Sequence, residues 1–218
     1  MKKITIAILM LLGTFSIASA EVGLNVGVSG NMGVFTAEGE ETMGTTEKGG
    51  SDRAVGVFGY ASIFVEKELG DYFAFGIDYN PSDMDSETTS TDKKCSDVGS
   101  ETASCDQIVK VSFSDMTTFY ATVNVTENLY VKAGIGEVDL ITKESLGTGG
   151  TYGDTSLDFN VLGVGYNKDL VNGLFVRAEG NYMDFDDIKL NSKTGETRFI
   201  KANGIAGASG KISVGKSF

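Results

Sequence analysis

The chain has 218 residues, of which 30 are acidic and 18 basic, and its formal net charge is −12 at neutral pH. This acidity argues against nucleic acid as a partner, because phosphate backbones require a basic surface. The chain has no histidine, the side chain on which proteases and acyltransferases generally rely as a general base. With two cysteines and no histidine, the sequence predicts no enzyme, no cofactor and no metal site.

Residues 1–20 have the layout of a secretory signal peptide. Lys2 and Lys3 precede an apolar run from Ile4 to Ile17, and Ala18 to Ala20 are small residues suited to cleavage. The run is shorter than the roughly 20 residues that a membrane-spanning helix needs. We therefore expect export and cleavage after Ala20, which removes two lysines, leaves one domain over residues 21–218 and changes the net charge from −12 to −14.

The mature chain contains eight segments in which side chains alternate between two faces, the period-two pattern of β-strands. They cover residues 22–36, 54–66, 72–80, 108–125, 129–141, 155–168, 174–188 and 204–218. The composition agrees, because 29 glycines and a single proline suit long strands in a tightly curved sheet. In segment 108–125, Phe113 and Phe119 are expected to share one apolar face. Asp115 interrupts this face, which indicates either a position near the outer rim or a β-bulge.

The segment after the turn at Asp169–Gly173 shows the alternation clearly. One face carries Leu174, Val176, Ala178, Gly180 and Tyr182, and the other carries Phe175, Arg177, Glu179, Asn181 and Met183. A soluble sandwich would bury the apolar face, whereas a membrane barrel turns it toward lipid and its polar face toward the lumen. In segments 54–66 and 155–168 the pattern does not decide which face points inward. In the first of them, for example, one face carries Val55 and Val57, and the other carries Phe58 and Tyr60.

The connections between the segments alternate in length. Long connections cover residues 37–52, 81–107, 142–154 and 191–203, and short ones cover 67–71, 126–128 and 169–173. Short periplasmic turns and longer outer loops are typical of single-chain outer-membrane barrels, in which eight is the smallest usual number of strands. The sequence therefore predicts an all-β fold, an eight-stranded antiparallel up-and-down transmembrane β-barrel.

Six charged residues are expected to point into the lumen: Asp78, Lys110, Lys132, Arg177, Glu179 and Lys211. Buried charges must pair or be solvated, and side chains just fill an eight-stranded barrel, so an internal ion-pair network is favoured over a gated ion path. Glu179 and Lys211 are expected to meet across neighbouring strands. Arg177 is expected to share their acidic partners or to reach Asp78.

Cys95 and Cys105 are the only cysteines, and both lie in the connection 81–107. An exported chain meets an oxidising compartment, so a disulfide between them is expected to close this loop.

The hairpin GVGYNKDLVNGLFVRAEGNYMDFDDI, residues 163–188, resembles the corresponding hairpin of small outer-membrane barrels of the OmpA-transmembrane-domain and opacity-protein type. The ending KISVGKSF resembles the C-terminal signal by which such barrels are recognised for assembly, with Ile212, Val214 and Phe218 on one face. Lys216 stands where family members usually have an aromatic or large apolar residue. The resemblance implies a bare barrel in the outer membrane of a Gram-negative bacterium, with lipid and the assembly machinery as partners, and brings no catalytic residues.

The expected function is a structural or surface-interaction role in the cell envelope. The barrel is expected to be a monomer that exposes four polar outer loops to a surface ligand. The alternative is a narrow OmpW-like channel for small or hydrophobic solutes. A third class, a secreted soluble carrier of the lipocalin kind, fits less well because the chain ends in phenylalanine, alternates its loop lengths and contains no tryptophan.

Overall fold

The structure is a computed structural model, and it describes residues 23–43, 47–85, 89–94, 104–145, 152–193 and 198–218. Within these ranges, the description excludes the side chains of residues 40–43, 47–54, 89–94, 104–110, 143–145 and 198. Strands make up nearly all of it. They are β1 (Leu24–Met43), β2 (Glu47–Leu69), β3 (Phe73–Asn80), β4 (Met84–Asp85), β5 (Thr89–Lys94), β6 (Ser104–Asn124), β7 (Leu129–Ser145), β8 (Thr155–Asp169), β9 (Leu174–Phe185), β10 (Ile188–Asn191) and β11 (Arg198–Ser217). No helix in the described residues is long and apolar enough to cross a membrane.

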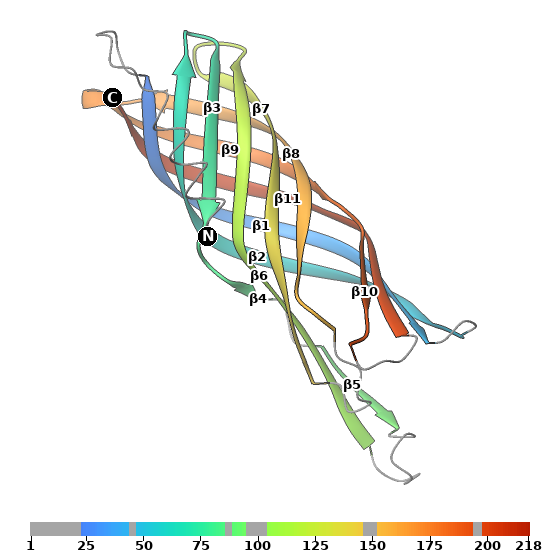
Figure 1. The fold of residues 1–218 in the computed structure, drawn as a ribbon. Helices are drawn as coiled ribbons and strands as arrows, with labels where there is room; N and C mark the ends of the chain where they lie inside the picture. The colour runs from blue at the N-terminus through green and yellow to red at the C-terminus, as the bar shows by residue number, and fades with distance from the viewer. Residues whose placement is uncertain (1–22, 44–46, 86–88, 95–103, 146–151, 194–197) are drawn as a thin grey trace.

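The strands form one closed antiparallel sheet. Its order is β1-β2-β3-β6-β7-β8-β9-β11, and β11 pairs with β1 to complete the ring (Figure 1). Leu24 and Phe218 fasten this last seam through two backbone hydrogen bonds, of 3.2 and 2.9 Å. Within the described residues, the short strands β4 and β5 pair only with β6, and β10 pairs only with β11. The prediction of an eight-stranded antiparallel barrel is confirmed.

Three tight connections lie at one end of the barrel, together with Gly23 and Phe218, and we call this the short-turn end. Gly23 accepts a hydrogen bond from Glu68 next to the first turn, and Asn128 in the second accepts one from Asn167 next to the third. At the other end, the long-loop end, strands run on into the predicted loops. Residues 37–52 were expected to be irregular, but β1 and β2 stay paired out to Met43 and Glu47, because ladder hydrogen bonds do not need an apolar face.

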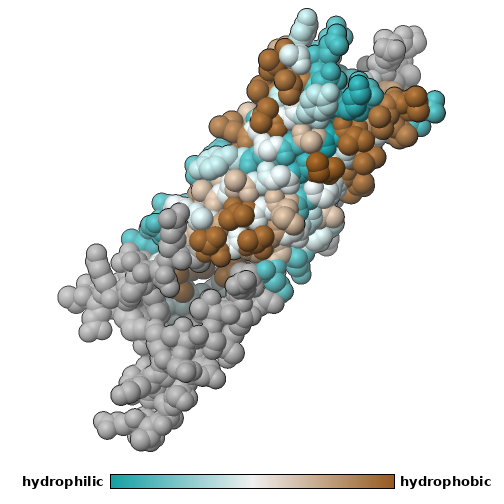
Figure 2. Space-filling view, turned by 180° about the vertical axis from the view of Figure 1, so that it is seen from behind, coloured by the Kyte–Doolittle hydropathy of each residue, from teal (hydrophilic) through white to brown (hydrophobic). Residues whose placement is uncertain are grey.

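Apolar side chains cover the outside of the barrel. On β1, Asn25, Ser29 and Asn31 are buried, whereas Val28 is 59% and Met32 69% exposed. Figure 2 shows brown, hydrophobic patches on the outer surface seen from behind. From Val26 to Val34 the exposed apolar row extends roughly 26 Å along the strand, or about 20 Å along the barrel axis at a tilt of about 40°, which approaches the height of about 25 Å of the apolar band of membrane barrels.

Burial shows which faces of β2 and β8 point into the lumen, a question that the alternation in their sequences left undecided. On β2, Phe58 and Phe64 are buried inside and Val57 and Ile63 are exposed. On β8, three side chains point into the lumen: Leu157, Phe159 and Val161. Three others point outward: Leu162, Val164 and Tyr166. The outer aliphatic rows of these strands therefore continue the apolar band.

A bulge at Asp115 changes the face of every residue above it on β6. Asp115 has φ +52°, and the register with β7 shifts between Ser114 and Thr117. One extra residue reverses the alternation, so Phe113 packs against the buried apolar cluster although Phe119 points outward. The expectation that Phe113 and Phe119 share a face was wrong, and of the two explanations for Asp115 the bulge is correct.

The wall has a break between β2 and β4. Pairing of β2 with β3 ends at Ile63 and Tyr79, and β3 itself ends at Asn80, just before Pro81. Proline has no backbone N–H to offer a neighbouring strand. Above this point, β2 has β1 as its only paired neighbour within the described residues.

Inward aromatic rings lie flat over glycines on adjacent strands. A Cβ atom built at Gly165 would be 2.1 Å from Cζ of Tyr130, and one at Gly76 would be 2.3 Å from Cζ of Tyr120. Gly27 under Phe64 and Gly215 under Phe175 repeat the arrangement. These inward glycines therefore make room for rings that fill the lumen.

Gly165→Ala should destabilise the barrel because its methyl group would collide with the buried ring of Tyr130. Overpacking of this kind costs about 1–3 kcal/mol. We expect the midpoint of urea unfolding in micelles, followed by circular dichroism, to fall. The matched control is Gly180→Ala, where a Cβ meets nothing within 4 Å. Equal midpoints for the two variants would contradict the account.

Candidate functional site: two charged layers in the lumen

The first charged layer lies near the short-turn end and is built around Arg177 of β9 and Glu66 of β2. The guanidinium donates from Nη1 and Nη2 to the two carboxylate oxygens, each at 2.9 Å. Asn25 and Tyr120 donate to the same carboxylate at 3.0 and 3.2 Å, and Asn167 accepts from Nε of Arg177 at 3.3 Å. Both charges are therefore hydrogen-bonded, as buried ions must be.

Three aromatic rings surround the Arg177 guanidinium. Its Cζ lies 4.9 Å from the ring centre of Phe175, 5.4 Å from that of Tyr130 and 5.5 Å from that of Phe64. A cation at this distance from ring faces is attracted by their quadrupoles. The rings also fill the space around the ion pair, and Arg177 is only 8% exposed.

The second charged layer lies further along the lumen and joins four side chains. Nζ of Lys132 is 2.9 Å from Oε1 of Glu179, and Nζ of Lys211 is 3.7 Å from Oε2 of the same carboxylate. Lys211 also forms a short ion pair with Asp78. Ser62 donates to Asp78 at 3.2 Å, so this carboxylate has two partners. All four charged side chains are at least nine-tenths buried.

The backbone of β8 makes the Lys132–Glu179 pair possible. Lys132 belongs to β7 and Glu179 to β9, so their side chains meet across the intervening strand. The inward positions of β8 beside them are Gly163, opposite Lys132, and Gly165, opposite Glu179. Larger inward side chains on β8 would fill the space through which the two charges meet.

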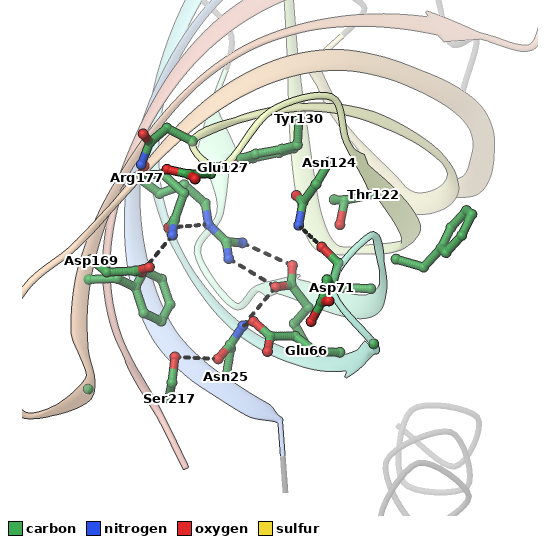
Figure 3. A pocket seen from close by; sticks show the side chains of 18 of the residues that line it. Asn25, Glu66, Asp71, Thr122, Asn124, Glu127, Tyr130, Asp169, Arg177 and Ser217 are labelled. Atoms are coloured by element: carbon green, nitrogen blue, oxygen red, sulfur yellow. Dashed lines mark hydrogen bonds and ion pairs between the residues drawn. The ribbon is translucent and has the colours of Figure 1, made fainter. Parts of the chain in front are cut away.

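The space inside the barrel is divided by these layers. A cavity of about 330 Å³ opens at the short-turn end and has Arg177 and Glu66 on its wall; Figure 3 shows Asp71, Glu127 and Asp169 around it. A cavity bounded by Asp78, Lys132 and Lys211 of the second layer has a volume of only about 30 Å³, enough for roughly two water molecules. Three cations, Lys132, Arg177 and Lys211, balance three anions, Glu66, Asp78 and Glu179.

Toward the long-loop end the lumen becomes apolar. Its buried apolar cluster consists of Phe58, Met84, Met116, Val138, Leu140, Leu157, Phe159, Val161, Met183, Phe185 and Ile205. Rings pack edge to face here; the centres of Phe58 and Phe113 are 5.7 Å apart. The free space in this cluster is again about 30 Å³.

Five of the six charged residues named from the sequence lie together in these layers: Asp78, Lys132, Arg177, Glu179 and Lys211. The expected partners of Arg177 were wrong, because it binds Glu66. Glu66 was missed in the sequence analysis because the alternation on β2 did not decide which face points inward. Glu66 lies on the same inward face of β2 as Phe64. Glu66 is also within reach because the narrow barrel brings β2 and β9 together across the lumen.

The remaining sequence predictions fall elsewhere. Lys110 lies on β6 above the Asp115 bulge, which reverses the alternation used to assign it to the lumen, and its side chain is outside the described residues. Cys95 is also outside them, as is the side chain of Cys105, so their disulfide stays a prediction. Ile212 and Val214 are exposed on the outer face of β11, and Phe218, directly after this strand, is exposed as well. No group of three potential metal ligands occurs among the described residues.

Comparisons with solved structures support the fold. The chain is similar to the outer membrane protein OprG from Pseudomonas aeruginosa, with 12% identity, a TM-score of 0.55 and coverage of 92% of this chain and 98% of OprG. It is also similar to the outer membrane protein AlkL, with 14% identity, a TM-score of 0.51 and 94% coverage of both chains. At these identities the likeness concerns the fold alone.

Sequence comparisons give the family. A search of curated proteins finds no significant match. The family model described as "Outer membrane protein beta-barrel domain" matches residues 6–205. A match over this much of the chain shows that the protein belongs to the outer membrane protein beta-barrel domain family.

Proposed function

We propose that the protein is a closed outer-membrane barrel with a structural and surface-facing role. The short-turn end faces the periplasm and the long-loop end faces outward, the usual orientation of such barrels. The observation that carries the proposal is the pair of charged layers, in which three buried cations and three buried anions cross the lumen. Above them apolar side chains pack together, and the cavities of about 30 Å³ found beside the second layer and in the apolar cluster support closure of both halves.

In this role the barrel anchors and presents the long hairpins at its outer end. Ile188 and Ala202, where β10 pairs with β11, pack against the apolar cluster in the upper lumen. The filled lumen would thus hold the base of an outer hairpin in place. The outer hairpins are then the part of the molecule available to a surface ligand.

Arg177→Ala tests the closure. The substitution leaves Glu66 without its counterion in a buried site, which costs about 3–5 kcal/mol before water entry relaxes it. We expect a lower urea midpoint and faster leakage of small ions from proteoliposomes. Lys168→Ala is the control, because Lys168 is exposed at the same end of the barrel. If the two variants have the same midpoint and the same leakage, the charged layer does not close the lumen.

A second candidate function is passage of small apolar solutes. Two observations favour it: the upper lumen is apolar, and the wall beside it is broken between β2 and β4. Phe58 and Met84 belong to the apolar cluster and lie on these two strands. A solute that entered here would have to displace packed side chains, because the free space is about 30 Å³.

Two single-tryptophan variants separate the candidates, since the natural chain has no tryptophan. Phe58 is 8% exposed and Val57 is 67% exposed on the same strand. In bilayers of lipids with brominated acyl chains, we expect strong quenching of Val57→Trp and little quenching of Phe58→Trp. Equal quenching at both positions would mean that apolar molecules enter the upper lumen, which would favour the second candidate.

A further inference from the structure

Basic charge is concentrated in the last outer connection of this acidic protein. Residues 189–203 contain four basic side chains and one acidic, a net charge of 4 − 1 = +3. Residues 37–52 contain one basic and five acidic side chains, a net charge of 1 − 5 = −4. Residues 81–107 contain two basic and seven acidic side chains, a net charge of 2 − 7 = −5. The β10–β11 hairpin therefore differs in sign from two of the other long connections.

Two of these lysines are placed directly opposite each other. Lys189 of β10 and Lys201 of β11 are partners in the strand register, and their Nζ atoms lie 4.2 and 5.6 Å from the ring centre of Phe199. Like charges in directly opposed positions repel each other and destabilise a strand pair. The shared aromatic ring offsets part of this repulsion, and an anion bound between the two ammonium groups would remove the rest.

The described carboxylates around this pair do not neutralise it. Among the described side chains, neither lysine has a carboxylate within ion-pair distance. Asp187, at the base of β10, accepts a hydrogen bond from the backbone N–H of Gly204. Glu40 of β1 is the other register partner of Lys201, but its side chain lies outside the described residues, so Lys189 is the stronger anchor.

The pair lies beyond the end of the outer apolar band, at the long-loop end of the barrel. The outward apolar row of β11 ends near Ala206, and Lys201 is five residues, or roughly 16 Å of strand, beyond it. Ile188 and Ala202, the neighbours of the two lysines in sequence, pack on the lumen cluster. The register between β1 and β11 shifts by one residue between Ala206 and Asn203, so Lys201 and Ala206 lie on the same outer face although five residues separate them. Because Ile188 and Ala202 face the lumen and side chains alternate between faces, Lys189 and Lys201 face away from the lumen.

From these observations we infer that Lys189, Phe199 and Lys201 form a binding site for the phosphate group of an outer-leaflet lipid. Two ammonium groups supply the charge, and the ring of Phe199 beside them supplies an apolar contact for the adjoining part of the headgroup. The site rests on the proposed outward orientation of the long-loop end, but not on closure of the lumen. Conductance and leakage measurements are therefore independent of it.

Native mass spectrometry of the purified protein with added lipids tests the site. The natural chain should retain phosphatidic acid in preference to phosphatidylcholine. Lys189→Gln with Lys201→Gln should reduce that preference, by about fivefold for each lysine. The matched control is Lys168→Gln with Lys216→Gln, two exposed lysines near the short-turn end. Heat-modifiable migration in SDS gels verifies that all variants are folded.

Three results would overturn the inference. One is equal retention of the two lipids by the natural chain, and another is an equal loss in the test and control variants, which would indicate attraction without a site. The third is full displacement of the lipid by millimolar inorganic phosphate, which would identify a soluble anion site rather than a headgroup site. If the short-turn end proved to face outward, the proposed function would fail in its orientation, and labelling of the loops on intact cells would show this separately.

Discussion

The requirement that every buried charge find a partner governs the interior of this barrel. Burying an unpaired ion costs several kcal/mol, and the lumen holds six ions that are all nearly inaccessible to water. The bidentate Arg177–Glu66 pair is the best satisfied of them, since Asn25, Tyr120 and Asn167 complete its hydrogen bonds. The small residues of β8 and the rings over glycines follow from the same need, because they bring the charges together and exclude water around them.

The two halves of the lumen are filled by different interactions. Near the short-turn end, ion pairs span strands that are not neighbours, as in the contact between β2 and β9, and thereby tie opposite walls together. Near the long-loop end, a cluster of described apolar side chains fills the lumen, and the wall is paired less completely beside Pro81. The ion pairs of the polar half link the walls of the barrel, whereas the apolar half lies beside a break in the strand pairing. This arrangement agrees with a closed barrel whose less completely paired half faces the outer hairpins.

The fold could be predicted because it depends on the local alternation of side chains along each strand. The site could be predicted only in part because its ion pairs join residues that are far apart in the sequence. Leu174 to Met183 alternate as expected because one face meets the outside and the other the lumen, and the short turns mark one end. Glu66 could not be assigned to Arg177 from sequence because 111 residues separate them and only closure of the barrel brings them together. The bulge at Asp115 was one of two interpretations, and it decided the face of Phe113.

The central claim is that the charged layers close the lumen, and the direct measurement is the conductance of the unmutated protein in planar bilayers at high salt. A lumen with three balanced ion pairs and about 30 Å³ of free space in the second layer predicts no steady ionic current after insertion of the folded barrel. Insertion should be verified independently by protease protection of the same sample. A large, steady conductance from a verified monomeric barrel would contradict the account and identify the protein as a channel.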